Sequence, residues 1–498
     1  MNPSKKTPNK IFFIGIGGSG MSGLAEVLCN LGYKVSGSDL IDSAVTKRLK
    51  SLGIDVRIGH EENNVDSQDM IIKSTAIGEE NVELIKAQKL GLPILKRAEL
   101  LSSLMNMKRG VAIAGTHGKT TTTSILASIM TEAMLDPTFI NGGIINSFAS
   151  NAKLGTGDYL LAEADESDKS FLMLQPSLEI ITNIDADHLV NYENDMNNLE
   201  EAFIKFVKKL PFNGLLVACG DDPIIQKLMP SFSRKTILYG FDDQNDYVVD
   251  NYKTSSFSSE FTLTNDEGVT SNFKLNLPGK HNVLNATAAS VLAIEEGISL
   301  INVKSALEKF SGISRRMQFL GKLDQTVVID DYGHHPTEIK NTILTLRESF
   351  PESEISLVFQ PHRFTRTKDL YEEFVDVERD TSIMRKFESY LHASDLDIFM
   401  KGESNYLDMK DMLWSLDSTS VQIQGALDIL DSYFEQIALT QFEREADKLY
   451  HWLLVEFADY FNGEEGRIKV SSKQDTDIQK AINILHDPVV YESIFLPQ

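Results

Sequence analysis

Residues 110–124, GVAIAGTHGKTTTTS, contain the residue types that bind the phosphates of a nucleotide. The apolar run 111–114 predicts a buried strand, and a sharp turn follows at Gly115, Thr116, His117 and Gly118. Glycines let backbone N–H groups point at an anion, and the N-terminus of the next helix adds partial positive charge. The segment therefore predicts a phosphate-binding loop between a strand and a helix.

The residues after the turn supply the side chains that such a loop needs. Lys119 can reach the β- and γ-phosphates, and the hydroxyl of Thr120 or Thr121 can ligate Mg²⁺. The spacing departs from GxxxxGK[ST], because Ile113 stands five positions before Gly118. An ordinary glycine turn before a helix is the alternative, and the Gly-Lys-Thr sequence disfavours it.

Acidic residues follow two further predicted strands of the same region. The strand 159–162 leads into EADESD at 163–168, and the strand 178–182 leads into NIDADH at 183–188. Carboxylate oxygens suit a hard cation such as Mg²⁺. The acidic residues of both loops are therefore candidate Mg²⁺ ligands, whereas solvated loop charge is the alternative.

A second glycine loop lies near the N-terminus, in a predicted strand–helix–strand unit at 11–39. Gly15, Gly17 and Gly20 fit GxGxxG, and Asp39 stands where a carboxylate that contacts ribose belongs. The pattern predicts a diphosphate on the helix N-terminus, from NAD or from another nucleotide. Ser74 follows the strand predicted at 70–73, where an open α/β sheet places ligand contacts.

Further polar residues gather at three junctions downstream. His281, Asn282 and Asn285 begin an Ala-rich helix, where Asn capping and ligand binding are equally open. Histidines and arginines then follow strands predicted at 326–329 and 355–359. Together with Arg315 and Arg316 they predict a cationic cleft, with chance surface arginines as the alternative.

The bulk composition restricts the class of protein. At 498 residues the chain favours about three domains. Its formal net charge of −24 argues against nucleic acid or an anionic membrane as a partner. We find no signal peptide and no apolar run of the roughly 18–20 residues that span a bilayer. We therefore expect a cytoplasmic protein, with Cys29 and Cys219 as unpaired core residues.

Eight motifs in this order and spacing resemble the Mur ligases, and within them the branch that joins L-alanine to UDP-N-acetylmuramate. The resemblance covers about residues 10–376 and rests on the motifs GIGGSGMSG, GTHGKTTTT, AEADESDKSFL, TNIDADH, GKHNVLNA, RRMQFLG, DDYGHHPTE and QPHRFTRT.

The resemblance implies an α/β fold with three domains. They are a Rossmann-like UDP-sugar domain at 1–108, a central P-loop ATPase at 109–320 and a Rossmann-like amino-acid domain that starts at 321–376. The acidic region 377–498 matches no part of the pattern and reads as mostly helical. Either it completes the third domain, or it is a foreign segment that serves a protein partner.

The resemblance also implies roles for individual residues. The UDP-sugar would contact Gly15, Gly17, Gly18, Ser19, Gly20, Asp39 and Ser74. ATP would contact Gly115, Thr116, His117, Gly118, Lys119, Thr120, Thr121, His281, Asn282, Asn285, Arg316 and Asp331. The metal would bind Thr120, Glu163 and His188, the amino acid would meet His362, Arg363 and Arg366, and catalysis would involve Lys119, His188, His334, Arg363 and Arg366.

The implied reaction uses ATP and Mg²⁺ to activate the lactyl carboxylate of UDP-N-acetylmuramate as an acyl phosphate, which the L-alanine amine then attacks. A related ligase that recycles a muropeptide onto the same sugar is the first alternative. A catalytically impaired protein that binds UDP-sugar and ATP is the second. An NAD oxidoreductase is disfavoured, because the glycine fingerprint coexists with a P-loop.

Overall fold

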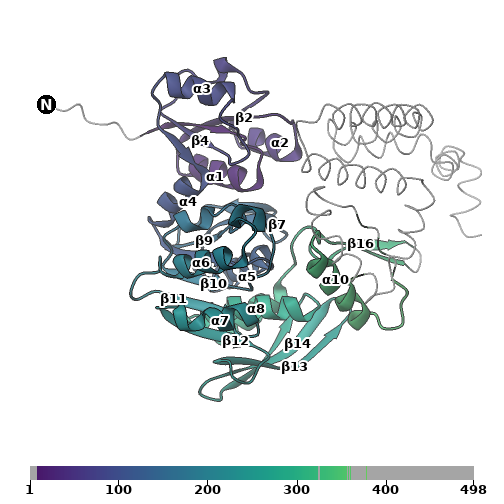
Figure 1. The fold of residues 1–498 in the computed structure, drawn as a ribbon. Helices are drawn as coiled ribbons and strands as arrows, with labels where there is room; N and C mark the ends of the chain where they lie inside the picture. The colour runs from purple at the N-terminus through teal and green to yellow at the C-terminus, as the bar shows by residue number, and fades with distance from the viewer. Residues whose placement is uncertain (1–7, 324–325, 356, 358, 360–376, 378–498) are drawn as a thin grey trace, which may run out of the picture. The chain divides into compact units, whose positions relative to one another are not determined.

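The computed structural model describes residues 8–323, 326–355, 357, 359 and 377 (Figure 1). All of these residues except 41–43 fall in one compact unit. His362, Arg363 and Arg366 lie outside the described residues, as does almost all of the acidic region 377–498.

The N-terminal part is a five-stranded parallel sheet in the order β3-β2-β1-β4-β5. Its strands are β1 (Lys10–Ile14), β2 (Lys34–Asp39), β3 (Asp55–Ile58), β4 (Met70–Lys73) and β5 (Ile94–Lys96). Its helices are α1 (Ser19–Asn30), α2 (Ala44–Ser51), α3 (Val82–Lys89) and α4 (Arg97–Met105), with a 3₁₀ turn at Glu62–Asn64. From β1 the successive strands are added first on one side of the sheet (β2, β3) and then on the other (β4, β5). The carboxyl ends of β1 and β4, where this change of side occurs, are where such sheets bind ligands.

The central part is a ten-stranded sheet in the order β15-β14-β13-β12-β11-β10-β6-β9-β7-β8. Its first strands are β6 (Arg109–Ala114), β7 (Thr138–Ile145), β8 (Ser150–Lys153), β9 (Tyr159–Glu163) and β10 (Leu178–Ile181). The others are β11 (Leu215–Cys219), β12 (Lys235–Gly240), β13 (Tyr247–Ser255), β14 (Ser258–Asn265) and β15 (Thr270–Leu275). The strand before the P-loop, β6, pairs in parallel with β9 on one side and β10 on the other.

Five helices and three 3₁₀ turns accompany the described part of this sheet. The helices are α5 (Lys119–Glu132), α6 (Met196–Val207), α7 (Pro223–Leu228), α8 (Lys280–Glu295) and α9 (Leu300–Lys309), and the turns are Ser170–Met173, Leu189–Tyr192 and Met229–Ser231. The P-loop helix α5 packs against α8 and α9 and buries Ile125, Leu126 and Ile129 completely. The apolar residues whose spacing predicts this helix are thus the ones that pack it into the core.

The alternating apolar pattern of residues 247–277 predicts a β-hairpin in a small appended sheet. The hairpin is confirmed by the antiparallel pair β14 and β15, but these strands form no separate sheet, because β13 pairs in parallel with β12 and continues the main one. Gly142 and Gly143, which as a glycine pair predict a turn, lie within β7 instead, where the pairing with β8 shifts register between Ile140 and Ile145. In both places the backbone finds partners in the large sheet that local sequence does not reveal.

The start of the third region is described only in part. β16 (Gln318–Leu323) and β17 (Thr326–Asp330) form an antiparallel pair, and α10 (Pro336–Ser349) follows. The expected strand at 355–359 is not seen, since the described residues 355, 357 and 359 belong to no strand. Ile339 and Ile343 of α10 form a small apolar cluster with Val377.

The N-terminal sheet is tied to the central one through helix α1, which packs against β7 and β8. A Cβ on Gly23 of α1 would lie 3.1 Å from the Ala152 Cβ, so the helix approaches the strands closely. Arg48 of α2 adds polar contacts, because its guanidinium donates to Ser150 Oγ at 3.1 Å and Asn151 Oδ1 at 2.9 Å. Among the described helices, none has both the length and the apolar character needed to cross a bilayer.

Candidate active site

The N-terminal glycine loop forms a crevice at the carboxyl ends of β1, β2 and β4. Gly15 takes a left-handed backbone (φ +79°), and α1 begins at Ser19. The Asp39 carboxylate accepts a hydrogen bond from Gly17 N at 2.7 Å, and a Cβ on Gly15 would lie 3.2 Å from the Ser74 Cβ. The predicted UDP-sugar residues therefore converge at one edge of the sheet.

A buried polar network that the sequence analysis missed supports this crevice. The Glu83 carboxylate of α3 is fully buried and accepts hydrogen bonds from Ser38 Oγ at 2.5 Å and Asn64 Nδ2 at 2.6 Å. It also lies 2.8 Å from His60 Nδ1. Because Ser38 directly precedes Asp39, this network fixes the end of β2.

The P-loop backbone has the shape that its glycines predict. Gly115 and Gly118 are both left-handed, with φ +125° and +86°. The residues that follow β10 bind the P-loop backbone. Asn183 Oδ1 accepts from His117 N at 2.8 Å, and Thr182 Oγ1 donates to His117 O at 2.6 Å. The P-loop is thus preorganised by a neighbouring strand end.

The Lys119 side chain folds back over its own loop and pairs with the carboxylate of Glu166. Its ammonium donates to Gly115 O at 2.6 Å and to Glu166 Oε2 at 2.8 Å. Burial opposes the charge, but the Glu166 and Asp165 carboxylates outweigh it and raise the pKa of Lys119. Burial and the Asp165 charge in turn raise the pKa of Glu166 to about 7, against the effect of Lys119.

Two of the predicted metal ligands border the same glycines. A Cβ on Gly142 would lie 2.9 Å from Glu163 Oε1, and a Cβ on Gly143 would lie 3.0 Å from Thr120 Cγ2. Gly142 N donates to the Glu163 carboxylate, so that carboxylate lies beside β7, and carboxylate oxygens are ligands that Mg²⁺ prefers. The third candidate, His188, is left-handed (φ +58°) and lies 3.4 Å from Asp187 Oδ2.

The residues of helix α8 divide into two roles. Asn282 donates to Pro278 O at 2.8 Å, which is a local contact at the helix start. Asn285 reaches the P-loop instead, where its Oδ1 accepts from Thr122 Oγ1 at 3.3 Å and would lie 2.3 Å from a Cβ on Gly118. His281 borders the same region, and burial lowers its pKa.

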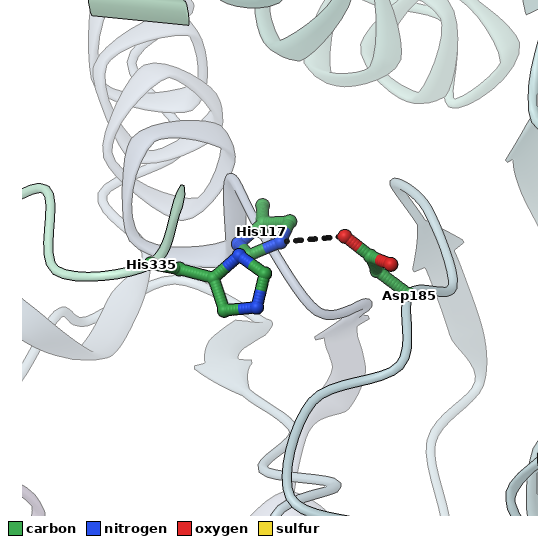
Figure 2. A group of neighbouring side chains, drawn as sticks. All are labelled: His117, Asp185 and His335. Atoms are coloured by element: carbon green, nitrogen blue, oxygen red, sulfur yellow. Dashed lines mark hydrogen bonds and ion pairs between the residues drawn. The ribbon is translucent and has the colours of Figure 1, made fainter. Parts of the chain in front are cut away.

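His117 is the centre of an ionic cluster (Figure 2). Its Nε2 lies 3.3 Å from Asp185 Oδ2, its Nδ1 lies 3.4 Å from Glu338 Oε1, and the His335 ring centroid is 5.0 Å away. Burial opposes protonation, but the two carboxylates outweigh it and raise the pKa of His117 to about 9.

His117, Asp185 and His335 offer three ligand atoms within 4.8 Å of one another, a donor set that fits a transition metal. In this structure both ring nitrogens of His117 face carboxylates, so the imidazolium explains the geometry without a metal.

Residues just before β16 and just before α10 surround Glu338. Arg316 Nη1 lies 3.7 Å from Glu338 Oε1, and His334 N donates to Glu338 Oε2 at 3.0 Å. Asp331 accepts from Met317 N and Gly333 N, both at 2.8 Å, and so shapes the loop that carries these groups.

The structure therefore assembles most of the predicted ATP residues around the P-loop. Sequence reasoning missed the partners that hold them, namely Glu166, Asp185, His335 and Glu338 as counter-ions or neighbours. The signal was present in the motifs ADESD, NIDADH and HHPTE.

A P-loop flanked by two acidic strand ends is typical of an enzyme that uses a nucleoside triphosphate. Family models agree: "Mur ligase family, catalytic domain" matches residues 10–109, "Mur ligase middle domain" 113–293 and "Mur ligase, glutamate ligase domain" 315–384. The third match extends past residue 376, where the recognised motifs end.

Solved structures give the same result. The UDP-N-acetylmuramate–alanine ligase of Thermotoga maritima is 33% identical, with a TM-score of 0.65 over 72% of this chain and 83% of that one. The UDP-N-acetylmuramate:L-alanyl-γ-D-glutamyl-meso-diaminopimelate ligase of Neisseria meningitides is 26% identical (TM-score 0.57; 62% and 100% covered). A murein peptide ligase of Psychrobacter arcticus is 25% identical (TM-score 0.61; 71% and 79% covered).

The chain belongs to the Mur ligase family, and it is an ATP-dependent ligase that forms carbon–nitrogen bonds.

Proposed function

We propose that this ligase joins L-alanine to UDP-N-acetylmuramate in peptidoglycan precursor synthesis, in the cytoplasm. The observation that carries the proposal is the P-loop of β6 and α5 between the acidic ends of β9 and β10, in a chain whose N-terminal sheet also has a glycine loop bonded to Asp39. The choice of L-alanine is supported by the likeness to the Thermotoga maritima ligase over 83% of its length.

The chemistry needs positive charge, because a carboxylate must approach the γ-phosphate of a polyanion. Lys119 would supply it to the phosphates, and Arg316 and His334 would supply it from the side of α10. The lactyl carboxylate attacks the γ-phosphate and ADP leaves. The alanine amine then attacks the acyl carbon, a proton leaves the nitrogen, and phosphate departs. We expect Arg363 and Arg366 to act on the same groups, although they lie outside the described residues.

Mg²⁺ fits the residues present, since Thr120, Glu163 and His188 are the types that would hold it. When bound, it would neutralise phosphate charge. The glycine loop with Asp39 and Ser74 would hold the UDP moiety, and Asn285 and His281 would border the nucleotide of ATP.

A muropeptide ligase on the same sugar is the second candidate. It is favoured by the likeness to the Neisseria meningitides enzyme, all of whose chain is covered at 26% identity. The two candidates share the ATP chemistry and differ only in the amine that attacks.

The test is phosphate release from Mg-ATP with UDP-N-acetylmuramate, with L-alanine or with L-alanyl-γ-D-glutamyl-meso-diaminopimelate. We expect turnover only when the sugar and L-alanine are both present. Lys119→Ala should lower that turnover by roughly 10²-fold or more, because it removes the cation from the phosphates. Lys153→Ala is the control, since Lys153 pairs with Asp136 outside this site.

Turnover with the peptide but not with L-alanine would replace the first candidate by the second. Binding of both nucleotides without turnover on either amine would mean that the chain is a catalytically impaired member of the family.

A further inference from the structure

Glu338 has more partners at the candidate site than a surface carboxylate needs. It lies in the first turn of α10, and its side chain is 14% exposed. Its oxygens lie 3.4 Å from His117 Nδ1, 3.7 Å from Arg316 Nη1 and 3.0 Å from His334 N. One carboxylate thus contacts the P-loop, the segment before β16 and the loop before α10.

The same end of α10 contacts the P-loop from a second direction. Thr337 Oγ1 donates to Asp185 Oδ2 at 3.3 Å, and that oxygen also faces His117 Nε2 at 3.3 Å. His117 is therefore held between the loop after β10 and the start of α10. A carboxylate on each side fixes the ring plane as well as its position.

The charges of the cluster favour this arrangement. Burial raises the pKa of the Glu338 carboxyl, but the His117 hydrogen bond and the Arg316 charge outweigh burial and hold it below its usual range. The charged and titratable groups around the pair include Asp185 and Asp187 after β10, His281 of α8, Arg316 before β16, Asp331 after β17, and His334 and His335 at the start of α10.

We propose that Glu338 is a positioning residue that ties the P-loop to the C-terminal part of the site through His117. It orients His117, Arg316 and the His334 backbone so that the cations on both sides of the nucleotide are in place before ATP binds. The proposal rests on the ATP dependence of the enzyme and not on the amine that it joins.

Glu338→Gln tests this role, because it keeps the shape of the side chain and removes the charge. Glu348→Gln is the matched control: it removes a carboxylate from the same helix, where Glu348 accepts from Tyr252 OH at 2.9 Å instead. Two measurements are made on the full chain, namely the pKa of His117 by NMR and the affinity for Mg-ATP by calorimetry from pH 6.5 to 9. The His117→Gln variant assigns the resonance.

We expect the pKa of His117 to fall by at least about one unit in Glu338→Gln, because one of its two counter-ions is lost. The affinity for ATP should fall roughly threefold at pH 8.5, because a one-unit fall from a pKa of about 9 lowers the protonated fraction of His117 by about that factor, and less at pH 6.5, where His117 remains protonated. Glu338→Asp should recover part of both, and Glu348→Gln should match the unaltered chain.

An unchanged His117 pKa, or an ATP affinity that falls equally at every pH, would overturn the proposal. So would a lowered pKa with unaltered ATP affinity. Failure of the unaltered chain to release phosphate with L-alanine is a separate result, because neither measurement needs the amine.

Discussion

At the scale of single residues, the P-loop lysine is held by an anion before any phosphate arrives. Lys119 donates to both oxygens of Glu166, at 3.0 and 2.8 Å, and to the carbonyl oxygens of its own loop. A bound phosphate has to replace these acceptors. The Glu166 carboxylate therefore competes with ATP for the same ammonium, and its protonation state decides how strongly.

Glu166→Gln should tighten ATP binding several-fold at pH 8, because it removes a negative charge beside the phosphates. Burial raises the pKa of Glu166 to about 7, so the carboxyl is neutral below that pH and charged above it. In the unaltered chain, ATP affinity should therefore rise as the pH falls from 8 to 6, and the variant should lose this dependence. Calorimetry with Mg-ATP measures both effects.

Glu200→Gln is the control for this change. Glu200 of α6 pairs with Lys227 of α7 at 2.7 Å, and neither residue belongs to the candidate site. A pH dependence that persists in Glu166→Gln would assign the titration to another group.

The sequence predicted the residues that motifs carry, but not their partners. The Gly-Lys-Thr motif indicates that Lys119 is a P-loop lysine at the start of a helix. Its contact with Glu166 spans 47 positions, however, and the contact of His117 with Glu338 spans 221. Such pairs depend on how strands are ordered in a sheet, and a spacing rule within one loop contains no information on that order. Asp39, by contrast, follows from the βαβ unit at 11–39, and Ser74 follows from its place directly after a strand of an open α/β sheet.

At the scale of elements, the position of β6 between β9 and β10 brings both acidic loops to the P-loop. Parallel strands that neighbour each other end at the same edge, so the sequence pattern of strand followed by acid predicts this meeting. It does not predict that β13 to β15 extend the same sheet, because pairing at its edge is a non-local choice.

The close approach of α8 to the P-loop makes Gly118→Ala severely damaging. A Cβ there would lie 2.3 Å from Asn285 Oδ1, in addition to the strain at φ +86°. We expect thermal unfolding to shift down by several degrees, and more than for Gly268→Ala, which has φ +75° but no atom within 4 Å. The φ strain alone costs on the order of 1 kcal/mol.

Equal shifts of the unfolding temperature in the two variants would show that the contact between Asn285 of α8 and the P-loop does not add to the cost of a side chain at Gly118.

At the scale of the whole molecule, the N-terminal and central sheets share one apolar cluster through α1. The N-terminal and central sheets are thereby coupled in stability. Arg48 extends this coupling, because it pairs with Glu26 of α1 and also donates to β8. Among the described residues of the third region, Ile339 and Ile343 form a separate cluster with Val377, whereas Phe319 and Phe350 contact Phe257, between β13 and β14 of the central sheet.

Arg48→Ala should therefore destabilise the contact between the two sheets. We expect a loss of about 1–3 kcal/mol, because it leaves the Glu26 carboxylate without its partner. Thermal unfolding followed by calorimetry measures it, and Lys47→Ala, an exposed cation on the same helix, is the control. A loss equal to that of Lys47→Ala would contradict a role for Arg48 between the sheets.

The two sides of the P-loop are stabilised by different interactions, which respond differently to ionic strength. On the side of β9 and β10, backbone hydrogen bonds of a parallel sheet fix the loops, and dissolved ions hardly affect these. On the side of α10, the contacts include ion pairs of His117 and Arg316 with Glu338, whose side chain is 14% exposed. Counter-ions screen such partly buried pairs less than exposed ones, so concentrated electrolyte should weaken the α10 side in part and leave the β9 and β10 side unchanged.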